Sequence, residues 1–408
     1  RLKLLLRRLE WPPTNQLVAH GIVHELPWRV AKVSEVDLQQ LPQTIHKQEQ
    51  DYLRGFFDGD GSVVLNTDLS GCVLTISQSF DRGEALLRFR AAFRGGIYSS
   101  EQGVGLRKHT VLWVVRGKMG KRAAAILGQQ SSMKQAQLKI AASWPESHES
   151  RLEMKVTWKH LKHFDHQPVA IPCSWAYVAG FFDAEGYIKV HAHSFGFGFR
   201  VAQKNPSILH CILVFLKEEK LAQRSPVYKG DNMNTLVFNT GINFQVLGQL
   251  LSAGLTVKRL EAELVQTMTA TNFIDVRNAM SRLSGNQSRY SRLDDEGVLR
   301  TREINRIWHR VGRAINHGCD EDFLGLLSKF QALQKEHTKA KLITQKRAVH
   351  EDIRHLLARG AGMMKAARKK LRLQSVDELK ERTSRARELM RRRGRSCGGA
   401  VAAVGDAW

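Results

Sequence analysis

Two carboxylates end two copies of one sequence pattern. Asp60 ends the segment 51–60, DYLRGFFDGD, and Glu185 ends the segment 176–185, AYVAGFFDAE, so the two acids lie 125 residues apart. A carboxylate at the C-terminal end of a helix faces the negative pole of the helix dipole, and two neighbouring carboxylates repel each other. A divalent cation between them relieves both penalties, and Mg²⁺ or Mn²⁺ suits oxygen ligands. Such an ion can activate water for an in-line attack on a phosphodiester.

Small residues repeat at a spacing of four in both copies, which predicts two helices that touch. Gly55 and Gly59 share one helix face in the first copy, as Gly180 and Ala184 do in the second. A glycine inside a soluble helix costs about 1 kcal/mol relative to alanine. Close approach of the two helix backbones compensates for that cost, and it would bring the two acids side by side.

The residues around each acid have expected structural roles. Asp58 and Asp183 stand two positions before the acids, so they point to another side of the helix and are expected to make structural hydrogen bonds. Gly61 and Gly186 follow the acids directly. We expect each of these glycines to take left-handed dihedrals and end its helix.

The same order of elements is predicted after each copy: helix, strand, strand, helix, strand, strand, helix. Alternating apolar and polar residues indicate half-buried strands with one exposed face. The fold class is therefore α+β, with two pseudo-symmetric αββαββα repeats. The predicted strands are 73–78, 96–100 and 109–116, then 187–190, 199–203, 226–229 and 235–240, and the predicted helices are 82–93, 122–127, 207–218 and 244–253.

The segments 53–61 and 178–186 resemble the two copies of the LAGLIDADG motif of single-chain homing endonucleases. Arg54 departs from the usual small residue of that motif, and Glu185 replaces the more common Asp. The resemblance implies a β-saddle that binds double-stranded DNA, with each acid holding metal near one scissile phosphate so that both strands are cut. It also implies that Gly59 and Ala184 contribute to the metal sites. The similarity covers about 51–268, roughly half of the chain.

Further catalytic candidates follow from the resemblance. Gln78 and Gln203 end matching strands and look like the family's polar residue that orients water. Lys258 looks like the basic residue that follows the last helix of a repeat, where an ammonium stabilises charge on the phosphate. In the first repeat a strict alignment places Ser132 there, and Lys134 substitutes only through a register shift.

Direct readout of DNA in the major groove would use alternate side chains of the strands. Individually, each candidate is more often a phosphate contact or a plain surface residue than a base reader. The candidates are Asn66, Ser77, Arg107, Lys108 and Arg116 in the first half, and Lys189, His191, His193, Arg200, Lys204, Lys229 and Asn234 in the second.

Composition supports a nucleic-acid partner. The chain has 63 Lys and Arg against 39 Asp and Glu, a net charge of +24, and such an excess favours a polyanion. No apolar run reaches the roughly 18 residues of a membrane span. The five cysteines include no CxxC pair, which argues against a disulfide framework and favours a reducing compartment. The basic start, RLKLLLRR, fits a chloroplast or mitochondrial transit peptide or simply a basic helix, and the nucleus also stays open.

The predicted organisation has five parts: an extension of unknown role (1–50), the first repeat (51–143), a linker (144–172), the second repeat (173–298), and a basic, mostly helical extension with a disordered end (299–408). One chain with both repeats predicts a monomer. From residue 300 onward, 26 Lys and Arg stand against 12 Asp and Glu, which also suits an RNA-binding splicing maturase on the same scaffold. A non-catalytic DNA-binding protein is a third reading, although both acids are retained. A scaffold without nucleic acid is disfavoured by charge and motif together.

Overall fold

The computed structural model describes residues 1–29, 45–67, 71–163, 170–191, 195–221, 227–238, 241–283, 290, 292–317 and 323–364. Helices and antiparallel sheets alternate along these residues, so the predicted α+β class is confirmed. Within the described ranges, no helix combines the length and the apolar character that a membrane crossing requires.

Two halves of the chain repeat one order of elements. The first half contains α3 (Lys47–Asp60), β4 (Gly61–Leu65), β5 (Cys72–Ser79), α4 (Glu84–Phe93), β6 (Gly96–Ser99), β7 (Thr110–Arg116), α5 (Gly117–Leu127) and α6 (Gln135–Ala142). The second half contains α8 (Trp175–Glu185), β8 (Gly186–Val190), β9 (Phe197–Gln203), α9 (Pro206–Glu218), β10 (Val227–Lys229), β11 (Asn234–Val237), α10 (Asn243–Ser252) and α11 (Arg259–Gln266). The predicted order of elements is therefore confirmed in both halves.

The two sheets also share one strand order. The first sheet runs β4-β5-β7-β6 and the second runs β8-β9-β11-β10, all antiparallel. Side chains alternate between a buried face and a more exposed one, as in β9, where Phe199 and Val201 are buried and Arg200 is exposed. This alternation is the period of two that predicted the strands.

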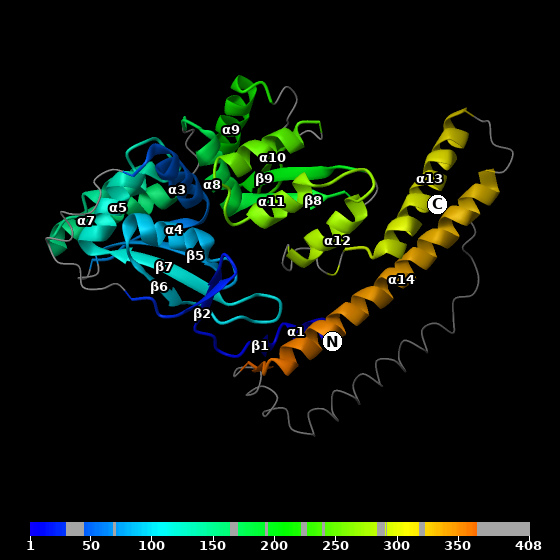
Figure 1. Ribbon diagram of the computed structural model, residues 1–408, viewed down its shortest axis with the longest axis horizontal. Helices are drawn as coiled ribbons and strands as arrows, with labels where there is room; N and C mark the ends of the chain where they lie inside the picture. The colour runs from blue at the N-terminus through cyan, green and yellow to red at the C-terminus, as the bar shows by residue number, and fades with distance from the viewer. Residues whose placement is uncertain are drawn as a thin grey trace, which may run out of the picture.

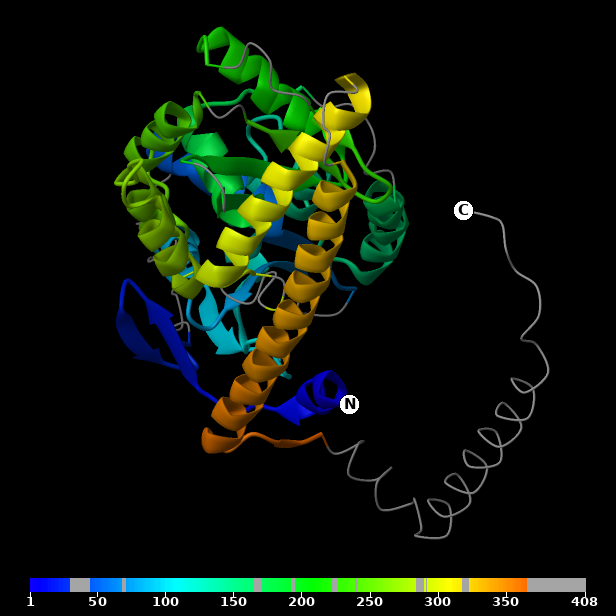
Figure 2. The same ribbon diagram turned by 90° about the vertical axis from the view of Figure 1, so that its right-hand side faces the viewer.

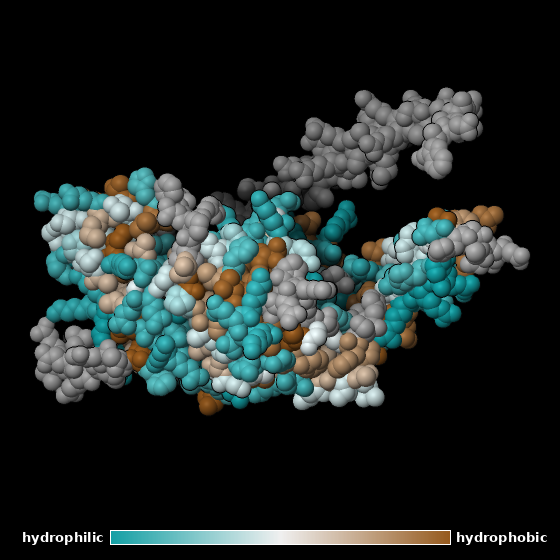
Figure 3. Space-filling model, turned by 90° about the horizontal axis from the view of Figure 1, so that it is seen from above, coloured by the Kyte–Doolittle hydropathy of each residue, from teal (hydrophilic) through white to brown (hydrophobic). Residues whose placement is uncertain are grey.

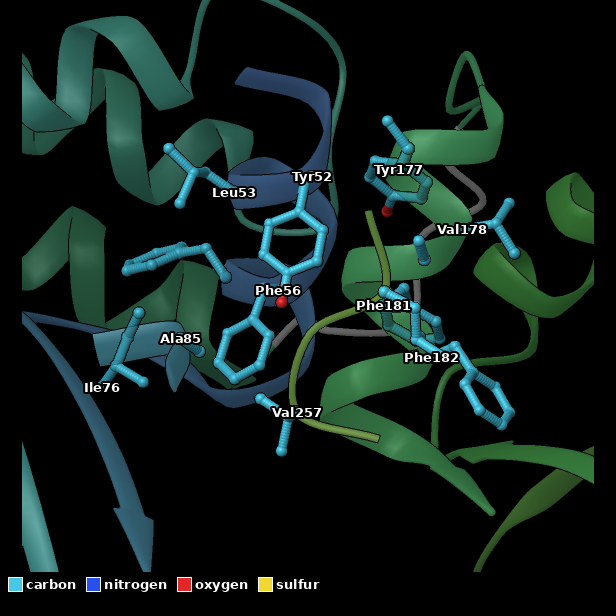
Figure 4. Close-up of a cluster of buried hydrophobic side chains, with 14 of the residues drawn as sticks. Tyr52, Leu53, Phe56, Ile76, Ala85, Tyr177, Val178, Phe181, Phe182 and Val257 are labelled. Carbon is cyan, nitrogen blue, oxygen red and sulfur yellow. The ribbon is translucent and has the colours of Figure 1, made fainter. Parts of the chain in front are cut away.

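The helices α3 and α8 pack against each other between the two halves, and the rest of each half is built outward from them (Figure 1). Their phenylalanines carry much of the core, because Phe56, Phe57, Phe181 and Phe182 are all almost completely buried. Figure 4 shows these two helices face to face, with aromatic side chains between them and on their outer sides. Burial of side chains of this size contributes about 1.5–3 kcal/mol each.

The predicted linker contains a helix. Residues 148–163 form α7 (His148–His163), where charges, histidines and prolines in 144–172 had indicated a connecting segment. The stretch has no glycine or proline, and its Trp158 is buried in the main hydrophobic core. An apolar anchor of this kind lets an otherwise polar segment fold as a helix against the body.

The two ends of the described chain meet. The N-terminal segment forms α1 (Leu2–Leu6), β1 (Leu9–Glu10), β2 (Gln16–Ala19) and β3 (Ile22–Glu25), and the C-terminal segment forms α12 (Phe273–Leu283), α13 (Asp295–His317), α14 (Phe323–Ala358) and β12 (Gly362–Met363). Leu9 of β1 pairs with Met363 of β12 in an antiparallel ladder. The long helix α14 thus runs back to the start of the chain, as Figures 1 and 2 both show.

The helical pair α13–α14 has a small core of its own, formed by Ile307, Val311 and Leu326. Its outer surface is exposed and bears Arg310 and Arg313 on one helix face. Seen from above, the pair projects from the body, and hydrophilic residues cover much of its visible surface (Figure 3). The predicted basic, helical extension from 299 onward contains most of α13 and all of α14, and its start at 299 falls inside α13. As a separate part of the chain it stays a prediction, and residues 365–408, including the expected disordered end, lie outside the described residues.

Candidate active site between the two repeats

The small residues lie where α3 and α8 touch. A methyl group built on Gly55 would lie 2.1 Å from the carbonyl oxygen of Tyr177, and one on Gly180 would lie 2.0 Å from that of Tyr52. Both distances are far inside van der Waals contact, so only glycine permits this approach. One turn further on, a methyl group on Gly59 would lie 2.4 Å from the Cβ atom of Ala184. The helices therefore stay close up to their C-terminal ends.

That contact brings the two terminal acids together. Asp60 is the last residue of α3 and Glu185 the last of α8, and a methyl group on Gly59 would lie 3.1 Å from Cγ of Glu185. The pKa of Asp60 is raised to about 6. Burial is the largest cause and the negative charge of Glu185 acts in the same direction, while Lys258, Gln78 and Lys134 lower the pKa. The carboxylates repel each other in a partly desolvated place, which a bound cation would relieve.

Each acid is held by the glutamine of its own repeat. Nε2 of Gln78 donates to Oδ2 of Asp60 at 2.5 Å, and Nε2 of Gln203 donates to Oε1 of Glu185 at 3.1 Å. The two glutamines come from matching positions near the ends of β5 and β9. An amide that donates to one carboxylate oxygen fixes the rotation of the acid and leaves the other oxygen for a ligand.

Lys134 and Lys258 occupy equivalent places. Lys134 precedes α6 and donates from Nζ to the carbonyl oxygens of Phe57 at 2.8 Å and Gly61 at 2.5 Å. Lys258 precedes α11 and donates from Nζ to the carbonyl oxygen of Phe182 at 3.1 Å. Both ammonium groups therefore lie at the C-terminal end of a motif helix, where the dipole favours a positive charge. Burial lowers the pKa of Lys258.

The structure resolves the choice that the alignment left open in the first repeat. Lys134, two positions after the Ser132 of the strict alignment, takes the place in the first repeat that Lys258 has in the second. Ser132 is buried instead, and its hydroxyl has no hydrogen-bond partner among the described residues. The register shift lies in the turn before α6. A strict alignment of the two repeats does not allow for a shift at this turn.

Asp58 and Asp183 make the kind of structural hydrogen bonds expected from their positions. Asp58 accepts from the backbone N–H groups of Met133 at 3.1 Å and Lys134 at 3.3 Å. Asp183 accepts two backbone N–H bonds, of 2.6 and 2.8 Å, just before α11. Each inner aspartate thus anchors the turn that carries the lysine of its own repeat. Burial raises the pKa of both aspartates.

The expected left-handed glycines are a wrong prediction. Gly61 has φ −73° and ψ 149°, and Gly186 has φ −77° and ψ 157°, both extended. Glycine is required there for space, because a methyl group on Gly61 would lie 2.3 Å from the ring of Phe57 and one on Gly186 would lie 2.0 Å from the ring of Phe182. Each helix passes directly into its strand, and the aromatic ring fills the corner.

Arg54, the departure from the motif, is buried and paired. Its guanidinium lies 3.1 Å from the carboxylate of Asp51 and donates to the carbonyl oxygens of Ser131 and Pro172, both at 3.0 Å. It therefore joins α3 to the chain segments that precede α6 and α8. A buried charge with a carboxylate partner and further hydrogen bonds can be tolerated in a helix interface.

Several DNA-contact candidates lie on the exposed sheet faces. Ser77, Lys189 and Arg200 are exposed on β5, β8 and β9, and Arg116 is exposed at the end of β7. Asn66 and His191 are half-buried just after β4 and β8.

The remaining candidates lie away from the middle of those faces. Arg107 pairs with Glu101 at 3.0 Å, and Lys108 pairs with Asp81, both outside the strands. Lys204, Lys229 and Asn234 lie together at one end of the second sheet, where Nδ2 of Asn234 donates to the carbonyl oxygen of Lys204 at 2.8 Å. His193 lies outside the described residues.

The donor set fits a hard divalent cation. The two carboxylates supply oxygen ligands, and the carbonyl oxygen of Gly59, next to Asp60, accepts from Nζ of Lys134 at 3.3 Å. Across the described ranges, no group of three or more His, Cys, Asp and Glu side chains forms a metal cluster. Mg²⁺ commonly binds through one or two carboxylates and completes its shell with waters and substrate phosphates, so a two-carboxylate site suits it.

Sequence reasoning singled out Asp58 and Asp183 but not Tyr52 and Tyr177, the tyrosines that bond to them. Both tyrosines belong to the repeated pattern Tyr-x-x-Gly-Phe-Phe-Asp, so the repeat itself was the signal that could have found them. Their hydroxyl groups contact the inner aspartates, which lie 131 and 119 residues away in the sequence.

Comparisons with known proteins give matches among solved structures. No protein-family model matches the sequence, and no curated protein matches it. The meganuclease I-AabMI bound to uncleaved DNA has a TM-score of 0.40 and 16% identity, over 59% of this chain and 94% of that chain. The homing endonuclease I-GzeII in complex with its DNA target has a TM-score of 0.36 and 14% identity, over 70% of this chain and 97% of that chain. I-SmaMI bound to uncleaved DNA in the presence of calcium ions has a TM-score of 0.37 and 12% identity, over 59% of this chain and 98% of that chain. The family that the two motif copies resemble is thus also the family of these structures.

Proposed function

We propose that this chain is a metal-dependent, site-specific DNA endonuclease of the homing type that hydrolyses both strands of a long double-stranded target. One observation supports this proposal above all. The contact between α3 and α8, possible only with glycine, places Asp60 and Glu185 side by side. Such a carboxylate pair is an unfavourable arrangement without a cation and a suitable one with it.

Asp60 and Glu185 would hold Mg²⁺ or Mn²⁺, with help from the backbone of Gly59 and Ala184. The bound ion would supply Lewis acidity toward a phosphodiester and a water of lowered pKa. Gln78 and Gln203 keep the acids in one rotamer through the hydrogen bonds of 2.5 and 3.1 Å. Fixed ligands avoid reorganisation when charge develops on the phosphate.

Lys134 and Lys258 would stabilise the negative charge of the attacked phosphate. Their ammonium groups are held by backbone carbonyls at the ends of the two motif helices. A positive charge fixed in a partly desolvated place stabilises a developing negative charge far more strongly than a solvated one does. The presence of one lysine in each repeat supports cutting of both strands.

The net charge of +24 and the exposed Lys189 and Arg200 support DNA as the substrate. Binding through phosphates releases counterions, so affinity should fall steeply with salt. Because one chain carries both repeats, we propose that the enzyme acts as a monomer.

The test is cleavage of a randomised-site DNA library with Mg²⁺ by the wild type and by Asp60→Asn and Glu185→Gln. We expect selective cutting by the wild type and a loss of about 10²-fold or more in each variant, as for removal of a preorganised charged group. Glu153→Gln, in an exposed part of α7, is the matched control and should cut like the wild type.

Three results would contradict the proposal. Cutting that persists in Asp60→Asn and Glu185→Gln would show that the acids are not catalytic. A wild type that cuts no DNA with any divalent metal, but binds intron RNA tightly and salt-sensitively, would favour a splicing maturase. Salt-sensitive DNA binding without cutting would instead favour a non-catalytic DNA-binding protein.

A further inference from the structure

Two tyrosines form reciprocal hydrogen bonds across the helix interface. The hydroxyl of Tyr52 on α3 donates to Oδ2 of Asp183 on α8 at 2.8 Å. The hydroxyl of Tyr177 on α8 donates to Oδ2 of Asp58 on α3 at 2.7 Å. Both tyrosines are completely buried and both aspartates almost so, and Figure 4 shows the two rings on facing helices. Each bond therefore joins one repeat to the other.

The same two carboxylates hold the turns that carry the lysines. Asp183 accepts from the backbone N–H groups of Thr256 and Lys258, at 2.6 and 2.8 Å. Asp58 accepts from Lys134 and its neighbour in the first repeat. A chain of contacts thus runs from the tyrosine of one repeat, through the aspartate of the other, to that other repeat's lysine.

An arginine lies over each tyrosine ring and is bonded near the same turns. The guanidinium of Arg88 lies 3.4 Å from the ring centre of Tyr52 and donates to Oγ1 of Thr256 at 2.6 Å. The guanidinium of Arg54 lies 4.7 Å from the ring centre of Tyr177. Both rings are therefore fixed on their faces as well as at their hydroxyl groups, which leaves the hydrogen bonds little freedom to shift.

We infer that Tyr52 and Tyr177 are positioning residues that form a crossed latch, in which each tyrosine sets the place of the lysine in the opposite repeat. Tyr52 would act on Lys258 through Asp183, and Tyr177 would act on Lys134 through Asp58. A buried carboxylate that loses one donor redistributes its remaining bonds, so the backbone amides it holds become less firmly fixed. The latch would make the geometry of each site depend on the other repeat.

The first test measures amide hydrogen exchange and needs no catalysis. In Tyr52→Phe, exchange at Thr256 and Lys258 should become at least about tenfold faster, with Met133 and Lys134 unchanged, because local opening sets the exchange rate. In Tyr177→Phe, exchange should become faster at Met133 and Lys134 and stay unchanged at Thr256 and Lys258. The matched control is Tyr290→Phe, which removes a 2.7 Å tyrosine–aspartate bond elsewhere, to Asp352, and should change neither pair.

The second test measures the cutting of each DNA strand and rests on the proposed function. Tyr52→Phe should slow the strand served by Lys258 about tenfold, the effect of about 1.4 kcal/mol in the barrier, and change the other strand less than about twofold. Tyr177→Phe should slow the other strand instead. The ratio of the two nicked products reports this directly, whereas a purely structural loss would lower both strands together.

The outcomes separate the latch from the endonuclease. A single variant that speeds exchange in both lysine-bearing turns would overturn the crossed latch. Variants that change exchange in neither turn would also overturn it. Equal slowing of both strands would overturn its role in positioning. Crossed exchange effects in a protein that cuts no DNA would support the latch while the nuclease proposal fails. If one variant does not fold, the other variant still decides through its own pair of amides.

Discussion

The exposed face of the first sheet carries Ser62, Thr75 and Ser77, with one cation, Arg116, at the end of β7. The matching face of the second sheet carries two cations, Lys189 and Arg200, on β8 and β9. The interior of the two repeats does not differ in this way. Each has a terminal acid with a glutamine donor, a lysine at the end of the motif helix, and an inner aspartate that receives a tyrosine hydroxyl.

This difference shows which positions the interface constrains. Between α3 and α8 there is no room for a side chain, because a methyl group at Gly55 or Gly180 would lie about 2 Å from a backbone oxygen of the other helix. Both copies therefore have glycine at this position. A side chain on the outer sheet face meets solvent or a partner and can change freely. If the chain acts as the proposed endonuclease, these two faces would meet two different halves of its DNA target.

The N-terminal segment adds a second difference, because it packs on the first repeat. Nε1 of Trp11 donates to the carbonyl oxygen of Gly105 at 2.8 Å, and Trp28 pairs with Ile97 of the edge strand β6. In the second repeat the edge strand β10 has its Tyr228 exposed. The N-terminal segment therefore contacts the first repeat, and β1 of this segment pairs with β12, which follows α14.

The largest expected effect comes from substitutions in the interface between α3 and α8, which is alike in the two repeats. Gly55→Ala and Gly180→Ala should each lower the free energy of unfolding by about 3 kcal/mol or more, because the new methyl group meets backbone at 2.0–2.1 Å. Urea unfolding measures both. Gly312→Ala in α13, where nothing lies within 4 Å, should instead stabilise its helix by about 0.5–1 kcal/mol. Equal tolerance of all three changes would contradict the close helix contact.

The next effect tests whether the two lysines are equivalent. Lys134→Met and Lys258→Met should each slow DNA cutting about 10²-fold, because each removes a fixed positive charge at the reacting phosphate. Strand-resolved cleavage measures the loss. Ser132→Ala should stay within about twofold of the wild type, since its hydroxyl has no partner among the described residues. If Ser132→Ala slowed cutting strongly and Lys134→Met did not, Ser132 would be the functional counterpart of Lys258, as the strict alignment predicts.

A smaller effect sharpens the contrast between the two sheet faces. Lys189→Ala and Arg200→Ala should each weaken DNA binding and reduce the dependence of log K on log salt by about 1 unit. Ser77→Ala, at an exposed position of the first sheet, should leave the slope unchanged. Fluorescence anisotropy across a salt series measures all three. If the dependence of log K on log salt were unchanged in both Lys189→Ala and Arg200→Ala, DNA would bind away from this face of the second sheet.

The smallest effect concerns pH and the N-terminal contact. His109 packs edge-on against Trp11, and its Nδ1 accepts from the N–H of Gly103 at 3.1 Å. Burial lowers the pKa of His109 below the ordinary value of 6.5, so the unfolded chain binds the proton first as the pH falls. Stability is therefore full above about pH 6.5 and declines as the pH drops through the lowered pKa.

Chemical unfolding at several pH values, compared with His109→Gln, measures this contribution. The variant should lose part of the decline below pH 6.5 and show little change above it. An identical pH profile in the two proteins would mean that His109 titrates alike in the folded and unfolded chains.

Local patterns predicted much of the fold. The alternation in 73–78 and 199–203 became β5 and β9, and the helix predicted at 207–218 became α9 with a shift of one residue. Boundaries were less accurate, since the helix expected at 122–127 begins at Gly117. Local periodicity reports which side of an element is buried, but the first turn of a helix is often decided by contacts outside it.

The sequence by itself determined the two motif copies, the pairing of Asp60 with Glu185, and the order of elements in each repeat, because these depend on short-range pattern and on repetition. Only the tertiary structure decided that Lys134 is the counterpart of Lys258 in the first repeat, that the backbone of Gly61 is extended, and that β1 pairs with β12. It also decided the crossed tyrosine–aspartate bonds, which join residues 131 and 119 positions apart. Such contacts form only when packing brings distant segments together, and no local pattern encodes which atoms will then meet.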